Sequence, residues 1–377
     1  AAGRELRSLS ARLSGITACA FGPDGASVAS GGWDKALRLW AAFSENPAAL
    51  EESREANPPL GLLLLAGYLE ARSGHHVTVL DTQAEKLGFP AIASRVRDAR
   101  PDVVGITVMT QTLVDVTRMI DVVRANAPSA RVVLGGPHVH LFPEETARLP
   151  GVDFLVQGEG EVAFGDLLDR IDDPAAVAGI PGIVFLRDGE VVITGKPALI
   201  EDLDALPFPA RHLTDVGRYG SVLAARSPAT TMFTSRGCPF GCSFCDRPHL
   251  GKRFRARSAG SVVDEMERCV ALGIREFLIY DDTFTVKRQR VVDVCEEILR
   301  RRLDVGYDVR ARVDTVDGDL LKLMARSGCR GIHYGVESGP PKILKVVKKG
   351  IDLDRVRQAF RETREAKMAT LAYFMIG

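Results

Sequence analysis

The alternation of apolar and polar positions divides the chain into three stretches with different periods. Residues 1–45 carry short alternating runs separated by turn residues, as in "ITACAFGPDGASVAS", and this pattern predicts antiparallel strands. Residues 57–200 and 230–377 instead alternate helix-length segments with short, almost wholly apolar segments rich in β-branched residues. That rhythm predicts two consecutive α/β units, each built on a parallel sheet covered by helices.

The first α/β unit is predicted to be a Rossmann-like, doubly wound parallel sheet. Helices are expected at "LGLLLLAGYLEAR", "AIASRVRDA" and "LVDVTRMIDVVRAN", and strands at "HVTVLD", "DVVGITVMT" and "ARVVLGG". A first strand is expected just before Asn57, but none is recognisable there. The apolar run "ALRLWA" at 36–41 is the only nearby segment that could replace it.

The second α/β unit follows a segment at 201–229 that is rich in proline and glycine and is interpreted as an interdomain linker. Five strands are expected at "TMFTS", "EFLIYDD", "YDVRARV", "GIHYGVES" and "ATLAYFMIG". Helices are expected between them, at "SVVDEMERCVALG", "RQRVVDVCEEILRRR", "GDLLKLMARSG" and "LDRVRQAFRETREAK". The pattern predicts a β/α barrel of the TIM type, complete or partial, with its active site at the carboxyl ends of the strands.

Composition and charge limit the classes of function. Of the 377 residues, 49 are Lys or Arg and 49 are Asp or Glu, so no net charge favours nucleic acid or an acidic membrane. The longest apolar runs are shorter than the roughly 20 residues of a membrane span, and no secretory signal is recognisable. We therefore expect a cytoplasmic protein, in whose reducing compartment clustered cysteines are metal ligands or catalytic groups rather than disulfides.

Three of the seven cysteines stand close together in "SRGCPFGCSFCDRP", at Cys238, Cys242 and Cys245. Three thiolates can ligate three irons of a [4Fe–4S] cluster and leave the fourth iron open to another ligand. The alternative is a structural zinc site completed by His249, although zinc sites usually draw ligands from two separate segments. Cys269, Cys295 and Cys329 are expected to be small buried hydrophobic residues.

Both α/β units resemble one family. "NPPLGLLLLAGYLEARSGHHVTVLD", "DVVGITVMT", "LGGPHVHLFPEE" and "DFLVQGEGE" are similar to a cobalamin-binding Rossmann-like domain, and Cys-x-x-x-Cys-x-x-Cys after a first barrel strand is the radical S-adenosylmethionine (SAM) signature. The resemblance is to the group that contains the anaerobic magnesium-protoporphyrin monomethyl ester cyclases and cobalamin-dependent radical methyltransferases. It implies a [4Fe–4S] cluster, SAM, cobalamin, a small-molecule substrate and an electron donor of the flavodoxin or ferredoxin type.

The resemblance and the predicted strand ends together suggest the residues that contact each cofactor. The expected SAM contacts are Phe244, Asp281, Asp282, Arg312, Glu337 and Ser338. The expected cobalamin contacts are Thr107, Met109, Gly135, Gly136, His138, Gly158 and Glu159. Helix capping by the two aspartates, and a simple turn at the two adjacent glycines, are the plain alternatives. The Asp-x-His-x-x-Gly motif that supplies an axial histidine in other cobalamin proteins is absent, so no histidine ligand is expected from Asn57–Gly61.

The domain organisation implied is a fragment at 1–45 similar to one WD repeat, a cobalamin-binding-like domain at 57–200, a linker at 201–229 and a radical SAM barrel at 230–377. A single propeller blade cannot close a ring, and the chain stops within the motif of the fifth barrel strand, so we expect a truncated barrel. Two chemistries stay open, which are methyl transfer to an unactivated carbon and oxidative cyclisation. A truncated or fused gene product without activity, and a zinc-binding or interaction protein, also stay open.

Overall fold

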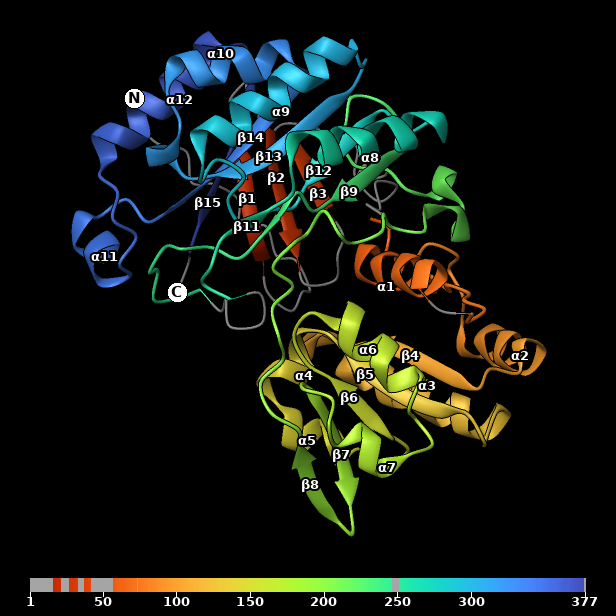
Figure 1. Ribbon diagram of the computed structural model, residues 1–377. Coiled ribbons are helices and arrows are strands. Elements are labelled where there is room, and N and C mark those ends of the chain that lie inside the picture. Colours follow the sequence, from red (N-terminus) through yellow and green to blue (C-terminus); the bar gives the residue numbers. More distant parts are fainter. Residues whose placement is uncertain are drawn as a thin grey trace.

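The computed structural model describes the backbone of three strands between residues 16 and 41, together with residues 57–72, 74–245 and 251–375. Two five-stranded sheets, each with its own helices, form the two large bodies of the molecule (Figure 1). In the described part of the chain, no helix is long and apolar enough to cross a membrane. The alternation of strands and helices in both bodies confirms the predicted α/β class.

The N-terminal strands form a separate antiparallel sheet, β1 (Ile16–Phe21), β2 (Ser27–Gly32) and β3 (Leu37–Ala41), in that order. This is the arrangement expected of a piece of one WD-repeat blade. Because β3 pairs with β2, the run "ALRLWA" does not serve as the missing first strand of the Rossmann-like sheet. That possible substitution is wrong.

The sheet of the first α/β unit has the order β4-β5-β6-β7-β8. Its strands are β4 (Val103–Thr107), β5 (Arg131–Gly135), β6 (Phe154–Val156), β7 (Ile183–Arg187) and β8 (Glu190–Ile193). Its helices are α1 (Leu60–Arg72), α2 (Phe89–Ala99), α3 (Leu113–Asn126), α4 (Pro137–Leu141), α5 (Pro143–Ala147), α6 (Gly160–Leu168) and α7 (Pro174–Val177). The first three strands are parallel, whereas β7 and β8 run antiparallel to their neighbours. Apolar residues of α2 and α3 cover one face and those of α6 and α7 the other, as a doubly wound sheet requires.

One predicted element of this unit is not found in the structure, and several observed elements, the β7–β8 hairpin among them, were not predicted. The segment "HVTVLD", 76–81, is not a strand. Within the described residues β4 is an edge strand, so 76–81 does not add a strand to its free side. The β7–β8 hairpin, in contrast, was not predicted. Its turn residues Asp188 and Gly189 both have positive φ, as a two-residue hairpin turn demands, and this Asp-Gly pair was the available signal.

The second unit contains the five predicted parallel strands, in the order β15-β14-β13-β12-β9. They are β9 (Ala229–Met232), β12 (Glu276–Ile279), β13 (Gly306–Ala311), β14 (Cys329–Glu337) and β15 (Ala369–Phe374). The predicted helices are α8 (Ala259–Ala271), α9 (Arg288–Arg301), α10 (Gly318–Arg326) and α12 (Leu353–Glu365). The short α11 (Pro341–Val346) and the two-stranded ladder β10 (Ser235–Arg236) with β11 (Arg255–Ala256) were not predicted.

The two faces of this second sheet differ in polarity. The helices α8, α9, α10 and α12 lie on one face, where alternate residues such as Phe277, Val309 and Ile332 form the core (Figure 1). The other face carries polar side chains. His333 contacts Tyr373 OH through Nδ1 at 3.1 Å and the carboxylate of Asp308 through Nε2 at 3.5 Å. The sheet is thus built as part of a barrel wall with a polar interior.

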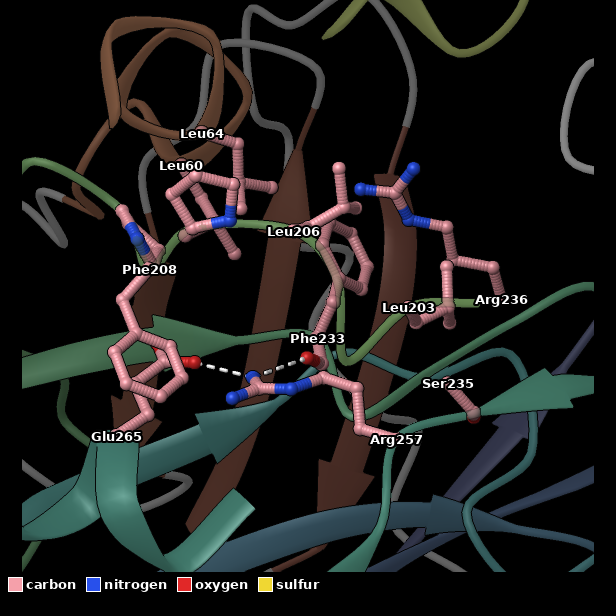
Figure 2. A pocket seen from close by; sticks show the side chains of 12 residues that line it. Leu60, Leu64, Leu203, Leu206, Phe208, Phe233, Ser235, Arg236, Arg257 and Glu265 are labelled. Carbon is pink, nitrogen blue, oxygen red and sulfur yellow. Dashed lines mark hydrogen bonds and ion pairs between the residues drawn. The ribbon is translucent and has the colours of Figure 1, made fainter. Parts of the chain in front are cut away.

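The linker between the two units packs closely on both. Ala210 N donates to Leu63 O of α1 at 2.9 Å, and a Cβ at Gly67 would collide with Phe208 O. The guanidinium groups of Arg257 and Arg268 both stack over the ring of Phe208, 5.1 and 4.5 Å from its centroid. Figure 2 shows the pocket at this junction, with leucines of α1 facing apolar linker residues. The linker therefore holds the units together through specific contacts.

Candidate active site at the facing edges of the two sheets

The turn after β9 is held in place by a buried carboxylate. Asp281, which follows β12, is fully buried and accepts four hydrogen bonds. The donors are Thr234 N at 2.6 Å, Thr234 Oγ1 at 2.5 Å, Ser235 N at 3.0 Å and Ser235 Oγ at 2.6 Å. With these bonds the carboxylate has its acceptor capacity satisfied. A direct contact of Asp281 with SAM stays a prediction, and these bonds favour a supporting role.

The cysteine loop begins at a glycine that no other residue can replace without strain. Gly237 has φ +81°, and a Cβ there would collide with Arg253 O. The approach is close because β10 pairs with β11 on either side of the loop, so that its two ends lie together. Gly241, in contrast, has no atom within 4 Å of a Cβ position. Of these two glycines, Gly237 is the one that the local geometry requires.

The three loop cysteines differ in exposure. Cys242 is buried, Cys238 is half-buried with its Sγ 3.9 Å from Thr283 Oγ1, and Cys245 is exposed. No group of three or more Cys, His, Asp or Glu side chains is close enough to hold one metal ion among the described residues. His249, the fourth ligand of the possible zinc site, lies outside those residues. The donor set, three thiols from one loop, fits a cluster whose irons are ligated separately.

Arg312, at the end of β13, organises the middle of the loop. Its guanidinium donates to Asp314 at 2.8 and 2.9 Å and to Lys349 O at 2.7 Å. It also lies 3.7 Å from Cys242 Sγ and 3.9 Å from the ring centroid of Phe240. A positive charge beside the sulfur stabilises a thiolate ligand. This arrangement favours cluster support by Arg312, while its predicted contact with the SAM carboxylate stays a prediction.

The end of β14 presents a strained, charged pair. Glu337 has φ +70° at a break in the β14–β15 register, and its Oε1 accepts from Lys349 Nζ at 2.8 Å. A Cβ at Gly335 would lie 2.5 Å from that oxygen and 2.6 Å from Nζ, so the glycine makes room for the pair. Backbone strain of this kind concentrates at functional sites. Lys349 Nζ is also 5.8 Å from the ring centroid of Phe244, which is 42% exposed.

The remaining predicted SAM contacts lie at the same edge of the sheet. Asp282 is exposed beside the buried Asp281, and Ser338 is half-buried directly after Glu337. The structure therefore brings the predicted SAM residues to the carboxyl ends of three adjacent strands, β12, β13 and β14, next to the cysteine loop. Their individual contacts with SAM stay predictions.

The carboxyl edge of the first sheet carries the predicted cobalamin residues. Thr107 ends β4, Met109 follows it, and Gly135 ends β5. Gly136 has φ +109°, and a Cβ there would lie 2.8 Å from Val108 O, so it is required for strand packing. His138 is 2% exposed, and its Nδ1 is 3.1 Å from Thr110 Oγ1, while its Nε2 has no hydrogen-bond partner among the described residues. A buried nitrogen without a protein partner is the kind of atom that a ligand or water satisfies.

The turn after β6 contacts the second unit through buried ion pairs. Glu159 accepts from Arg255 at 2.6 and 2.8 Å and from Ile200 N at 2.7 Å, and Glu161 pairs with Arg236. All four charged side chains are at most 8% exposed. Burial alone would lower the pKa of Arg236, but the carboxylates of Glu161 and Glu159 hold that pKa above its ordinary value. Glu159 is thus engaged with β11, which favours an interdomain role over its predicted cobalamin contact.

These ion pairs show how the two sites are related. Glu159 and Glu161 follow the carboxyl end of β6, and Arg236 follows that of β9, two residues before Cys238. The carboxyl edges of both sheets therefore face the same interface. Parallel α/β sheets place their ligands at such edges. The acidic turn and its arginine partners were not predicted as a pair, because sequence separations of 75 and 96 residues give no local signal.

The other described cysteines do not belong to the site. Cys269, Cys295 and Cys329 are buried in the core on the helix side of the sheet, as predicted. Burial raises the pKa of the Cys269 thiol to about 11, and it raises those of Cys295 and Cys329 as well. The raised pKa values disfavour the thiolate form, which is the form that binds metal.

Comparisons with family models agree with this organisation. A B12 binding domain matches residues 48–168, the Radical SAM superfamily matches 232–377, and a WD domain G-beta repeat matches 3–41. Two solved structures share the fold. TsrM from Kitasatospora setae, solved with cobalamin and a [4Fe–4S] cluster, has a TM-score of 0.72 and 24% identity over 85% of this chain and 67% of its own. OxsB, solved with aqua-cobalamin, has a TM-score of 0.76 and 19% identity over 98% of this chain and 61% of its own.

Three curated proteins are similar to this chain, and each match covers 85% of it. An uncharacterized methyltransferase of Pyrococcus horikoshii is 34% identical, and the match covers 69% of it. The cytidylyl-2-hydroxyethylphosphonate methyltransferase of Streptomyces wedmorensis is 30% identical over 68% of its length, and the anaerobic magnesium-protoporphyrin IX monomethyl ester cyclase of Rubrivivax gelatinosus is 29% identical over 59%. The chain thus spans between 59% and 69% of these relatives. It belongs to the cobalamin-binding radical SAM proteins, the family of methyltransferases and anaerobic cyclases whose cofactors are a [4Fe–4S] cluster, SAM and cobalamin.

Proposed function

We propose that this protein is a cobalamin-dependent radical SAM methyltransferase acting on an unactivated carbon of a small-molecule substrate. The observation that carries the proposal is the meeting of the two sheet edges at Glu161–Arg236, two residues from Cys238. This contact supports a cobalamin site at the edge of the first sheet, beside the cysteine loop. Chemistry that uses both cofactors on one substrate needs that proximity.

The residues present fit the family's cofactors. Cys238, Cys242 and Cys245 would ligate three irons of the cluster, and Arg312 would stabilise the thiolate of Cys242. On the opposite edge the orphan Nε2 of His138 would receive a hydrogen bond from, or give one to, a polar group of cobalamin. No histidine precedes α1 in the described Asn57–Leu60 segment, so the lower face of cobalamin would lack an imidazole ligand from that loop.

When bound, the cluster supplies an electron that cleaves SAM to methionine and a 5′-deoxyadenosyl radical, and cobalamin carries the methyl group. The protein's own residues bind SAM and orient it. Lys349 offers a cation to the SAM carboxylate, either while it stays paired with Glu337 or after that pair opens. Glu337 offers an acceptor to the amino group or the ribose hydroxyls of SAM. Phe244 is exposed beside Lys349 and offers a face for adenine.

The test is the set of products formed from SAM by the anaerobically reconstituted protein with dithionite and cobalamin. Slow 5′-deoxyadenosine formation without substrate is expected, and it should vanish in Cys245→Ala. Methyl transfer also converts a second SAM to S-adenosylhomocysteine, whereas oxidative cyclisation yields 5′-deoxyadenosine alone. A protein with a reducible cluster that forms no 5′-deoxyadenosine would contradict the assignment as an enzyme.

A further inference from the structure

A basic and apolar patch surrounds the short helix α11 beside the cysteine loop. We call it the α11 patch, and it consists of exposed Lys342, Ile343, Lys345, Val346 and Lys348. Val346 is 65% and Ile343 41% exposed, which is unusual for large aliphatic side chains on one short helix. No acidic residue occurs between Ser338 and Ile351, so the positive charge of the patch is not neutralised along this segment.

The α11 patch is joined directly to the loop that carries the cluster ligands. Ser243 N donates to Val347 O at 3.0 Å, and Ser243 Oγ lies 3.5 Å from Val346 O. Ser243 stands between Cys242 and Cys245, and Cys245 is itself exposed. A protein seated on this patch would therefore lie against the outer side of the cluster loop.

We propose that the α11 patch is the docking surface for an acidic one-electron donor protein that carries a flavin hydroquinone. This inference rests on the proposed function, because a reduced cluster must receive its electron from outside the chain. The exposed aliphatic residues supply the centre of a small transient interface, and the three lysines supply the long-range attraction. One electron passes from the anionic flavin hydroquinone to the oxidised cluster, which leaves a neutral semiquinone and a reduced cluster with no proton transferred.

The test compares two reductants on one charge-reversal variant, K342E/K345E/K348E. The rate of cluster reduction is followed by bleaching of its visible absorbance, with a purified acidic flavodoxin hydroquinone or with dithionite. With flavodoxin at low ionic strength, the rate should fall about tenfold or more in the variant, because steering charges of this kind change association rates by that factor. With dithionite the rate and the iron content should equal those of the unmodified protein. Added salt should slow the flavodoxin reaction of the unmodified protein and remove most of the difference.

A matched control reverses three exposed cations at the opposite end of β14, in K322E/R326E/K367E. This variant has the same net charge and should keep the unmodified rate with flavodoxin. Equal rates for both variants, or a parallel fall with both reductants, would overturn the docking proposal. Because the readout is cluster reduction and not SAM cleavage, an absence of 5′-deoxyadenosine would count against the proposed function alone.

Discussion

Single residues around the cysteine loop show how far side-chain chemistry could be anticipated. The cysteines, and the acidic and basic residues just after the strands, were identifiable because they follow apolar segments at fixed offsets. The side chains with which these residues pair were not identifiable from the sequence. Lys349 meets Glu337 only because β14 ends in a residue with positive φ and the chain turns back through α11, which no local pattern reveals.

The steric demand at Gly237 gives a prediction at this scale. Gly237→Ala combines a positive φ with a collision against Arg253 O, so the loop must shift where β10 meets β11. We expect the reconstituted variant to lose most of its iron, compared with about four irons per chain in the unmodified protein. Gly241→Ala, with open space around it, is the matched control and should keep its iron. Equal iron contents in both variants would contradict the loop geometry described above.

At the scale of elements, the sequence predicted the longer apolar strands and the helices between them, but not the short β6, the β7–β8 hairpin or the β10–β11 ladder. All five strands of the second sheet were predicted because each is apolar and lies beside another. The segment "HVTVLD" has a similar composition, but it does not pair with the free edge of β4 and is not a strand. Whether an apolar segment forms a strand depends on pairing with a neighbouring backbone, and neither hydrophobic periodicity nor β-propensity encodes that pairing.

The buried ion pairs between the β6–α6 turn and the β10–β11 ladder give a prediction for this scale. Glu161→Gln removes the nearer carboxylate from the buried guanidinium of Arg236 and leaves it only Glu159 Oε1 at 3.6 Å, and breaking a buried pair costs about 3–5 kcal/mol. We expect the free energy of unfolding in urea to fall by an amount of that order. Glu201→Gln, which breaks the exposed pair with Arg253, should change it by less than about 1 kcal/mol. A Glu161→Gln effect as small as that of Glu201→Gln would show that the turn does not couple the two units.

For the whole molecule, the order of two α/β units and a linker was predictable, but the way the units meet was not. Their contact depends on Arg236 and Arg255, which lie on a ladder of only two residues per strand. It also depends on the linker, whose backbone bonds to that of α1 through Ala210 N and Leu63 O. Such contacts connect distant segments and leave no periodic signal in the sequence. They nevertheless bring the carboxyl edges of the two sheets together, which is the basis of the proposed function.

The central claim is that SAM binds the open iron of a three-cysteine [4Fe–4S] cluster beside cobalamin. The most direct test is electron paramagnetic resonance of the anaerobically reconstituted, cobalamin-loaded protein, recorded with and without SAM. We predict a reduced [4Fe–4S] signal whose g values change when SAM is added, and a cob(II)alamin signal without splitting from an axial nitrogen. A reduced cluster signal that SAM leaves unchanged, or stoichiometric zinc in place of iron, would contradict the account.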